Sequence, residues 1–271
     1  MSSGQAPPNV GRITYRENLT PDLAIIRVQQ ADGSEVPDFK AGQFVALGLK
    51  VDGDDKITYR AYSLASPPEE KKHFEFYVKW ATEPVMGKFT STLFRMGQGD
   101  SLYWRKPAGA FTIEDRKADG TPETRRLILV ASGTGLAPFV SYALHLKIAG
   151  SKREIVLLHG AKYAQELGYR DVLERMAASN PNFKYLPTVS RPDHQLSQGW
   201  RGSTGRVEML LGSQLEKTVG EKVTPENSFF HICGYQGTID SVIAVLSPLS
   251  FVTNRSKRKD GSFDIKIETY G

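Results

Sequence analysis

The stretch "RRLILVASGTGLAPFVSYALHL", Arg125 to Leu146, decides the fold of the second half of the chain. An apolar run typical of a buried strand leads directly into a Gly-Thr-Gly turn and then into a helical segment. Gly133 and Gly135 can adopt positive φ and let a phosphate approach the backbone, and Pro138 suits the first turn of a helix. On its own, this turn is as compatible with a tight strand-to-helix corner as with a nucleotide site.

Strands and helices alternate from this stretch to the end of the chain. The hydrophobic pattern predicts strands at 126–131, 153–161, 183–190, 228–234 and 262–270 and helices at 139–149, 166–179, 206–217 and 237–246. This order predicts an α/β domain with a five-stranded parallel sheet and helices on both faces. Because ligands of such sheets bind at the carboxyl ends of the strands, the Gly-Thr-Gly turn lies where a ligand is expected.

The first half of the chain has a different pattern. Short alternating segments separated by turn residues predict strands at 23–30, 42–51, 60–66 and 73–81, and the last alternates as a half-buried strand does. Several strands at this spacing indicate an antiparallel β-barrel. We therefore divide the chain into a disordered N-terminus (1–10), a barrel domain (11–115), a linker (116–125) and an α/β domain (126–271).

Composition excludes several classes of protein. Cys233 is the only cysteine among 271 residues, so an intrachain disulfide, a thiolate zinc site and a four-cysteine iron–sulfur cluster are excluded, and no metal site is expected. A net charge of +5 is modest and is what a soluble protein ordinarily carries; the alternative is that it reflects binding to a partner of opposite charge. The basic run 254–262 lacks the aromatic residues that stack on nucleic-acid bases, so no nucleic-acid partner is expected. No apolar run has the length of a membrane span, and the first nine residues do not form a secretory signal, so we expect a cytoplasmic protein.

Three motifs in order resemble the ferredoxin–NADP(+) reductase family. They are "RAYSLAS" at 60–66, "GTGLAP" at 133–138 and Cys233-Gly234. The resemblance runs from about Gly11 to Gly271, and "KPAGAFT" at 106–112 is similar to the bacterial members. It implies that the barrel binds FAD and that the α/β domain binds NADP(H).

The resemblance assigns FAD contacts in the barrel. It implies that Arg60 binds the FAD pyrophosphate, that Tyr62 lies against the isoalloxazine ring, and that Ser63 places its hydroxyl beside flavin N5. The other residues implied to bind FAD are Ala61, Tyr77, Val78, Lys79, Gly87, Thr90 and Ser91. The alternatives are a core aromatic residue at 62, a strand-end polar residue at 63, and a simple helix N-cap at Thr90 or Ser91.

The resemblance also assigns the NADP contacts. It implies that Gly133, Thr134, Gly135, Leu136 and Pro138 hold the nicotinamide-side phosphates. Ser190 and Arg191, with Arg206, are implied to bind the 2′-phosphate that distinguishes NADP from NAD. Asp193 argues in the opposite direction, because an acidic residue there suits a free 2′-hydroxyl, and ordinary surface arginines are the alternative.

The catalytic residues implied by the resemblance are Ser63, Cys233, Glu268 and Tyr270. Cys233 borders the nicotinamide as a positioning group, with Gly234 allowing close approach. Glu268 joins a polar network with Ser63 and Cys233, and Tyr270 covers the flavin face that nicotinamide must reach. Gly271 follows Tyr270, whereas plant-type chains end at the tyrosine. The alternatives are that Cys233 is a small core residue and that Tyr270 belongs to a frayed terminus.

The implied function is that of an FAD-dependent oxidoreductase, a ferredoxin–NADP(+) reductase. It exchanges hydride between NADP(H) and flavin N5 and single electrons with ferredoxin or flavodoxin. We expect a monomer whose Lys257, Arg258 and Lys259 steer this acidic partner. The alternatives are a reductase feeding an oxygenase or another redox system, a flavin-less binding module, and a generic nucleotide-binding protein.

Overall fold

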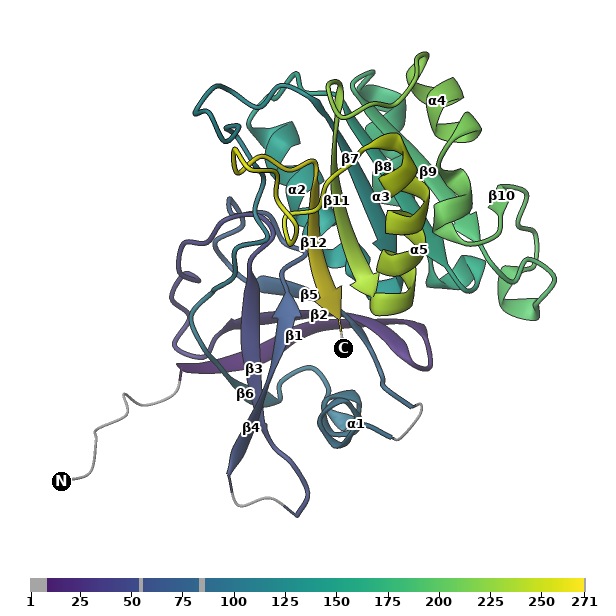
Figure 1. Ribbon diagram of the computed structural model, residues 1–271. Helices are drawn as coiled ribbons and strands as arrows, with labels where there is room; N and C mark the ends of the chain where they lie inside the picture. The colour runs from purple at the N-terminus through teal and green to yellow at the C-terminus, as the bar shows by residue number, and fades with distance from the viewer. Residues whose placement is uncertain (1–8, 54–55, 83–85, 271) are drawn as a thin grey trace. The chain divides into compact units, whose positions relative to one another are not determined.

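The computed structural model describes residues 9–53, 56–82 and 86–270. The chain divides into an N-terminal unit, 1–112, and a C-terminal unit, 113–271 (Figure 1). Most of the segment 1–10, predicted to be disordered, lies outside the described residues. Gly271 lies outside them as well. Among the described residues, no helix combines the length and the apolar composition that crossing a bilayer requires.

The described residues of the N-terminal unit form one antiparallel sheet and one helix. The strands, in the order β4-β3-β6-β1-β2-β5 across the sheet, are β1 (Asn9–Thr20), β2 (Leu23–Gln30), β3 (Phe44–Lys50), β4 (Ile57–Ser63), β5 (Phe74–Lys79) and β6 (Ser101–Trp104), and the helix is α1 (Lys88–Arg95). A bridge between Leu64 and Phe76 joins the end of one edge strand, β4, to the other, β5. The sheet therefore closes on itself, and the predicted barrel is confirmed.

The barrel core corrects one detail of the strand expected at 73–81. Phe74, Phe76 and Val78 point into the apolar core, as their alternation predicts. The residues between them, Glu75 and Tyr77, are buried as well, so β5 is covered on both faces and is not half-buried. Glu75 is tolerated there because its carboxylate forms an ion pair with Arg27, 2.6 Å away on β2.

The C-terminal unit is built on a parallel sheet of six strands. In the order β10-β9-β8-β7-β11-β12 across the sheet, they are β7 (Arg126–Ser132), β8 (Ile155–Ala161), β9 (Phe183–Val189), β10 (Ser203–Thr204), β11 (Ser228–Tyr235) and β12 (Ile265–Tyr270). All pairings in the sheet are parallel, which confirms the predicted α/β class. The expectation of five strands is wrong by one, because β10 has two residues and no periodicity can reveal it.

Four α-helices accompany this sheet: α2 (Ala137–Ile148), α3 (Arg170–Ser179), α4 (Ser213–Val219) and α5 (Gln236–Leu246). Single-turn 3₁₀ segments lie at Gly133–Leu136, Ala164–Glu166, Gln195–Ser197, Val207–Leu210 and Ser247–Leu249. The helix predicted at 206–217 is broken, because Gly212 has a φ of 79° and separates a 3₁₀ turn from α4. The helix predicted at 166–179 begins at Arg170, since Tyr169 has a φ of 60°.

Helices cover both faces of the parallel sheet (Figure 1). Ile239 and Val242 of α5 and Leu215 of α4 pack in one apolar cluster with alternate residues of the central strands. On the opposite face, the ring of Tyr142 of α2 meets His231 of β11 edge-on at 5.4 Å. The carboxyl ends of the strands remain available for a site.

Candidate functional site

The two glycines of the Gly-Thr-Gly turn meet different surroundings. Gly133 has a φ of 55°, and a Cβ built on it meets no described atom within 4 Å. A Cβ on Gly135 would overlap the carbonyl oxygen of Cys233, which is backbone and cannot move aside. Gly135 therefore lets the turn pack against the end of β11, while Gly133 leaves open space above the turn.

This turn is suited to a phosphate group. It forms a 3₁₀ segment that continues into α2, with Pro138 in the first turn of the helix. No described side chain caps the start of the 3₁₀ segment, so its first backbone amides are candidate donors, whereas the Ala137 amide at the start of α2 already donates to the Thr134 carbonyl oxygen. Anions bind at helix starts of this kind, and the space above Gly133 would admit one.

β11 and β12 place Cys233 opposite Glu268. Their register pairs these two residues and then Tyr235 with Tyr270. The Cys233 thiol lies 3.8 Å from Glu268 Oε2 and is fully buried. Burial raises the pKa of Cys233, so the sulfur stays protonated and is not a nucleophile. Tyr270 is half-buried at the end of β12.

Two exposed arginines lie near the carboxyl ends of β9 and β10. Ser190 and Arg191 follow β9, and Arg206 follows β10, whose Ser203 pairs with Thr188 of β9. The two loops are joined by a 3.0 Å hydrogen bond from the Thr188 hydroxyl to the carbonyl oxygen of Gly205. Within the part of the chain that the structure describes, the Arg206 side chain makes no hydrogen bond or ion pair. The Arg206 guanidinium is therefore free to receive an anion, and the exposed Arg191 keeps donors beyond the one bonded to the Tyr163 hydroxyl.

Sequence reasoning missed an aromatic pair beside Arg191. The ring of Tyr163, two residues after β8, lies 4.3 Å from the imidazole of His194. Arg191 Nη1 donates a 3.3 Å hydrogen bond to the Tyr163 hydroxyl. The position of Tyr163 just beyond a predicted strand was the available signal, but only the folded loop shows that His194 reaches it.

In the N-terminal unit, the residues expected to bind FAD come together from β4, β5 and α1. Tyr62 packs its ring against Phe76 of β5 and Phe89 of α1, with centroid distances of 6.4 and 6.0 Å. Burial raises the pKa of the Tyr62 hydroxyl well above its ordinary value. Arg60 and Ala61 are exposed, whereas Ser63 is buried at the end of β4. Arg60 donates to the carbonyl of Tyr59 at 2.9 Å, and its other donors have no partner among the described residues.

The start of α1 resembles that of α2 in having no side-chain cap. The N-cap residue is Gly87, so the alternative of Thr90 or Ser91 as N-cap is wrong. Both hydroxyls instead accept hydrogen bonds from the residues that follow β5. Thr90 accepts from the amide of Ala81 at 3.2 Å, and Ser91 accepts from Trp80 Nε1 at 2.9 Å. The backbone amides of the first turn therefore remain for an anion. The remaining expected residues lie on β5, where Tyr77 and Val78 are buried and Lys79 forms an ion pair with Asp22 at 3.3 Å.

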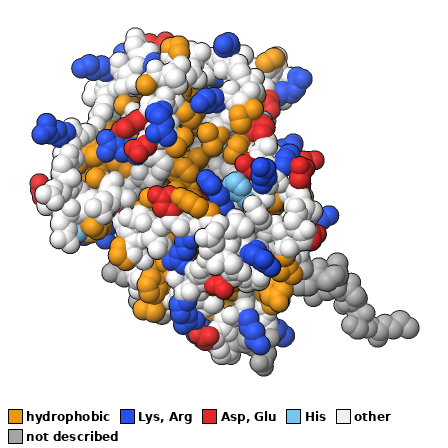
Figure 2. All heavy atoms as spheres, turned by 180° about the vertical axis from the view of Figure 1, so that it is seen from behind, with side chains coloured by type: hydrophobic (Ala, Val, Ile, Leu, Met, Phe, Trp, Pro, Cys, Tyr) orange, Lys and Arg blue, Asp and Glu red, His pale blue; other side chains and the backbone are white. Residues whose placement is uncertain are grey.

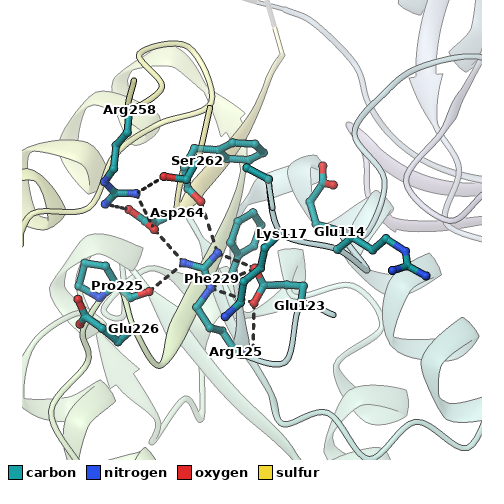
Figure 3. A pocket seen from close by; sticks show the side chains of 13 residues that line it. Glu114, Lys117, Glu123, Arg125, Pro225, Glu226, Phe229, Arg258, Ser262 and Asp264 are labelled. Atoms are coloured by element: carbon teal, nitrogen blue, oxygen red, sulfur yellow. Dashed lines mark hydrogen bonds and ion pairs between the residues drawn. The ribbon is translucent and has the colours of Figure 1, made fainter. Parts of the chain in front are cut away.

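A pocket of about 300 Å³ lies at the opposite ends of the strands, where β7, β11 and β12 begin. The Arg125 guanidinium lies between Glu123 and Asp264, at 2.5 and 2.8 Å, and Arg258 lies 2.5 Å from Asp264 (Figure 3). We call these four residues the Arg125 network. Because its charges are satisfied by one another, we assign this pocket a structural role.

The Arg125 network changes the picture of the basic run at 257–259. Arg258, expected to steer an acidic partner, is engaged with Asp264. Lys257 Nζ lies 5.1 Å from the ring centroid of Phe263, and Lys259 is exposed. On the face shown in Figure 2, Lys and Arg side chains are interspersed with Asp and Glu. The two lysines are therefore the members of the run that are available to a partner.

Comparison with known families identifies both units. Residues 11–113 match the family model described as an oxidoreductase FAD-binding domain, and residues 129–243 match that of an oxidoreductase NAD-binding domain. The two expected cofactor-binding domains are thereby confirmed. Both sets of residues also fit their cofactors in this structure, given the free Arg60 donors, the uncapped start of α1 and the open space at Gly133.

Individual relatives match between 72% and 98% of the chain. A ferredoxin–NADP reductase of Pseudomonas aeruginosa is 30% identical over 240 residues, which are 85% of this chain and 86% of that protein. A component of the Na(+)-translocating NADH-quinone reductase of Marinomonas is 30% identical over 202 residues, 72% of this chain but only 47% of the relative. Among solved structures, a ferredoxin NADP+ reductase from Neisseria gonorrhoeae with bound FAD and NADP has a TM-score of 0.78 at 23% identity, covering 98% of this chain and 99% of the other.

Proposed function

The chain belongs to the ferredoxin–NADP(+) reductase family, and we propose that it passes electrons between NADP(H) and an acidic one-electron carrier protein such as ferredoxin or flavodoxin. FAD supplies, when bound, the exchange of a hydride for single electrons that no side chain can perform. We further propose that the protein works as a monomer in the cytoplasm, where its buried free thiol stays reduced.

The observation that carries the choice of NADP is the pair of exposed arginines beyond β9 and β10. Arg191 follows β9 and Arg206 follows β10, and these two strands pair with each other in the sheet. A 2′-phosphate dianion requires such cations, whereas a free 2′-hydroxyl is usually bound by a carboxylate. Asp193 is exposed on the same loop, and its single charge is outnumbered there.

The other expected residues have distinct tasks in this proposal. Arg60 and the first-turn amides of α1 bind the FAD pyrophosphate, and Tyr62, fixed by its two phenylalanine neighbours, presents a rigid ring to the flavin. The Gly133–Leu136 turn binds the nucleotide phosphates. Ser63 places its hydroxyl beside the flavin.

Cys233, Glu268 and Tyr270 act at the nicotinamide. The protonated Cys233 thiol and Glu268, paired across β11 and β12, form a compact polar surface against which the nicotinamide is oriented. Tyr270, two residues after Glu268, covers the flavin until nicotinamide displaces it. Until then, the tyrosine ring keeps water from that face of the flavin.

The test is the effect of Arg191→Ala combined with Arg206→Ala on nucleotide preference. We expect KM for NADPH to rise about 10-fold or more for each guanidinium removed from the 2′-phosphate, while KM for NADH changes little. The measurement is anaerobic reduction of the bound flavin followed by absorbance. Arg175→Ala, an exposed arginine of α3, is the matched control. Equal losses for both nucleotides would contradict the proposal.

A second candidate is favoured by the similarity to the NADH-quinone reductase component, which covers 72% of this chain. In this alternative the protein feeds electrons from NAD(P)H into an oxygenase or another larger redox assembly. Purified ferredoxin and flavodoxin separate the two candidates, because only the first requires fast reduction of either carrier. Slow reduction of both, with rapid bleaching of the flavin by NADPH, would favour the second.

A further inference from the structure

Three side chains surround the ring of Tyr163 at the carboxyl end of β8. His194 lies against its face at 4.3 Å with an interplanar angle of 32°. Arg191 donates to its hydroxyl at 3.3 Å. Lys162 Nζ lies 5.4 Å from the ring centroid. A half-buried phenol thus holds an imidazole and a guanidinium beside each other, with a further cation close by.

The backbone fixes the protonation pattern of His194. Its Nδ1 accepts a 3.2 Å hydrogen bond from the amide of Leu196, which makes His194 the N-cap of the 3₁₀ turn Gln195–Ser197. An accepting Nδ1 carries no proton, so in the neutral imidazole the proton is on Nε2. His194 is exposed, and in the described ranges Nε2 has no hydrogen-bond partner. The Nε2–H is therefore a donor of fixed orientation.

His194 and Arg191 belong to one turn. The amide of His194 lies 3.4 Å from the carbonyl oxygen of Arg191, and both side chains contact Tyr163. The nearest carboxylate on β8's loop, that of the buried Glu166, accepts from the amide of Lys162 at 3.2 Å. The turn also carries one exposed carboxylate, Asp193, and the donors that suit a phosphate dianion are those of Arg191 and His194.

We propose that His194 is a specificity-determining residue, whose Nε2–H binds the 2′-phosphate of the nucleotide together with Arg191, and that Tyr163 positions both. This inference rests on the proposed use of NADP(H) and adds to it two residues that the family motifs do not contain. The contribution of His194 is selective: it acts on the 2′-phosphate and leaves the rest of the nucleotide untouched.

Calorimetric titration of the full FAD-loaded chain with adenosine 2′,5′-bisphosphate and with AMP tests this role without turnover. The variant is His194→Asn, because asparagine is a good N-cap acceptor and keeps the bond from Leu196, while its shorter side chain takes the N–H donor away from the position of Nε2. We expect affinity for the bisphosphate to fall about tenfold, as for one charge-assisted hydrogen bond, and affinity for AMP to stay constant. Gln195→Ala, an exposed neighbour in the same turn, is the control.

An unchanged affinity for the bisphosphate in His194→Asn, or an equal loss for both ligands, overturns the inference. A second variant, Tyr163→Leu, removes the ring beneath the imidazole; we expect the same selective loss, and a fully retained preference for the bisphosphate overturns the positioning role. Titration of the wild-type protein with the same two ligands distinguishes failure of this inference from failure of the proposed function. If wild type binds the bisphosphate no more tightly than AMP, the choice of NADP itself is wrong.

Discussion

Gly135 packs directly against the backbone of Cys233, so closely that a side chain on Gly135 would overlap the Cys233 carbonyl oxygen. The turn after β7 and the end of β11 are thereby held together without any side chain between them. This contact places the Gly-Thr-Gly turn beside the residue that carries the buried thiol. It gives Gly135 a structural task that differs from the ligand-binding task proposed for Gly133.

Gly135→Ala and Gly133→Ala should therefore fail in different ways. Gly135→Ala forces backbone apart, and we expect it to lower the free energy of unfolding by about 1–3 kcal/mol. Gly133→Ala enters open space at a φ of 55°, with a cost of about 1 kcal/mol, but weakens nucleotide binding because its methyl group occupies the phosphate position. Urea unfolding and NADP+ titration measure the two effects. Nucleotide affinity unchanged in Gly133→Ala would remove this turn from the site.

Arg60→Ala should yield protein that loses FAD on dialysis, because the variant lacks the guanidinium that we propose binds the pyrophosphate in bidentate fashion. The measurement is the ratio of flavin to protein absorbance before and after dialysis. Arg12→Ala, which removes an exposed arginine on β1 of the same barrel, serves as the control. Full retention of FAD in Arg60→Ala would exclude this residue from the FAD site.

Tyr270→Ser should strengthen occupancy of the flavin face by nicotinamide, because the ring that competes for this face is gone. We expect NADH to gain more than NADPH, since NADPH is already held by its 2′-phosphate, so discrimination between them falls. The spectral change on adding NADP+ and the two kcat/KM values measure this. Tyr270→Phe keeps the ring and should behave as wild type. Unchanged discrimination in Tyr270→Ser would count against a covering role.

His159 should make the C-terminal unit sensitive to acid. It is fully buried on β8, its Nδ1 lies 2.9 Å from the Tyr185 hydroxyl, and burial lowers its pKa to about 3. The unfolded chain binds this proton below about pH 6.5 but the folded chain does not, so folding loses about 1.4 kcal/mol per pH unit between about pH 6.5 and pH 3.

His159→Gln, which cannot titrate, tests this expectation. Between pH 6.5 and pH 5 the wild type should lose about 2 kcal/mol more unfolding free energy than the variant. Urea unfolding of both proteins at the two pH values gives the difference. The same pH dependence in both would show that His159 is not responsible.

Lys257→Glu combined with Lys259→Glu should slow electron transfer to an acidic carrier at low salt and flatten its dependence on ionic strength. Arg258 is left intact, because its loss would disturb Asp264. Flavin reduction by NADPH should be unaffected. The control is Lys147→Glu with Lys152→Glu, which changes the net charge equally at other exposed positions. An unchanged salt dependence would exclude the two lysines from docking.

Local patterns were sufficient to predict most of the architecture. Buried parallel strands such as β7 and β8 are continuous apolar runs, and the glycines around 133 mark the turn between strand and helix. The two-residue β10 was missed because it is formed by pairing with β9 and not by its own sequence. β5 was predicted to be half-buried because Glu75 is polar, whereas burial of this residue depends on Arg27, 48 positions away.

The candidate site was predictable only where its residues follow one another in motifs. Arg60 to Ser63 and Gly133 to Pro138 are contiguous, so the sequence contains their arrangement. Tyr163 and His194 lie on different loops, and the contact between their rings depends on how residues 190–197 fold back. The Arg125 network likewise joins residues from two distant segments, 123–125 and 258–264.

The Arg125 network joins β7 and β12 at their amino ends through the ion pair of Arg125 with Asp264. The Gly-Thr-Gly turn, Arg191, Arg206 and the pair Tyr163–His194 all follow the carboxyl ends of strands. The ion pairs that join the strands and the residues proposed to bind the nucleotide thus lie at opposite ends of the strands of one sheet. A redesign of nucleotide preference confined to the exposed residues Arg191, Asp193 and Arg206 would leave the Arg125 network and the pairing of β10 with β9 intact.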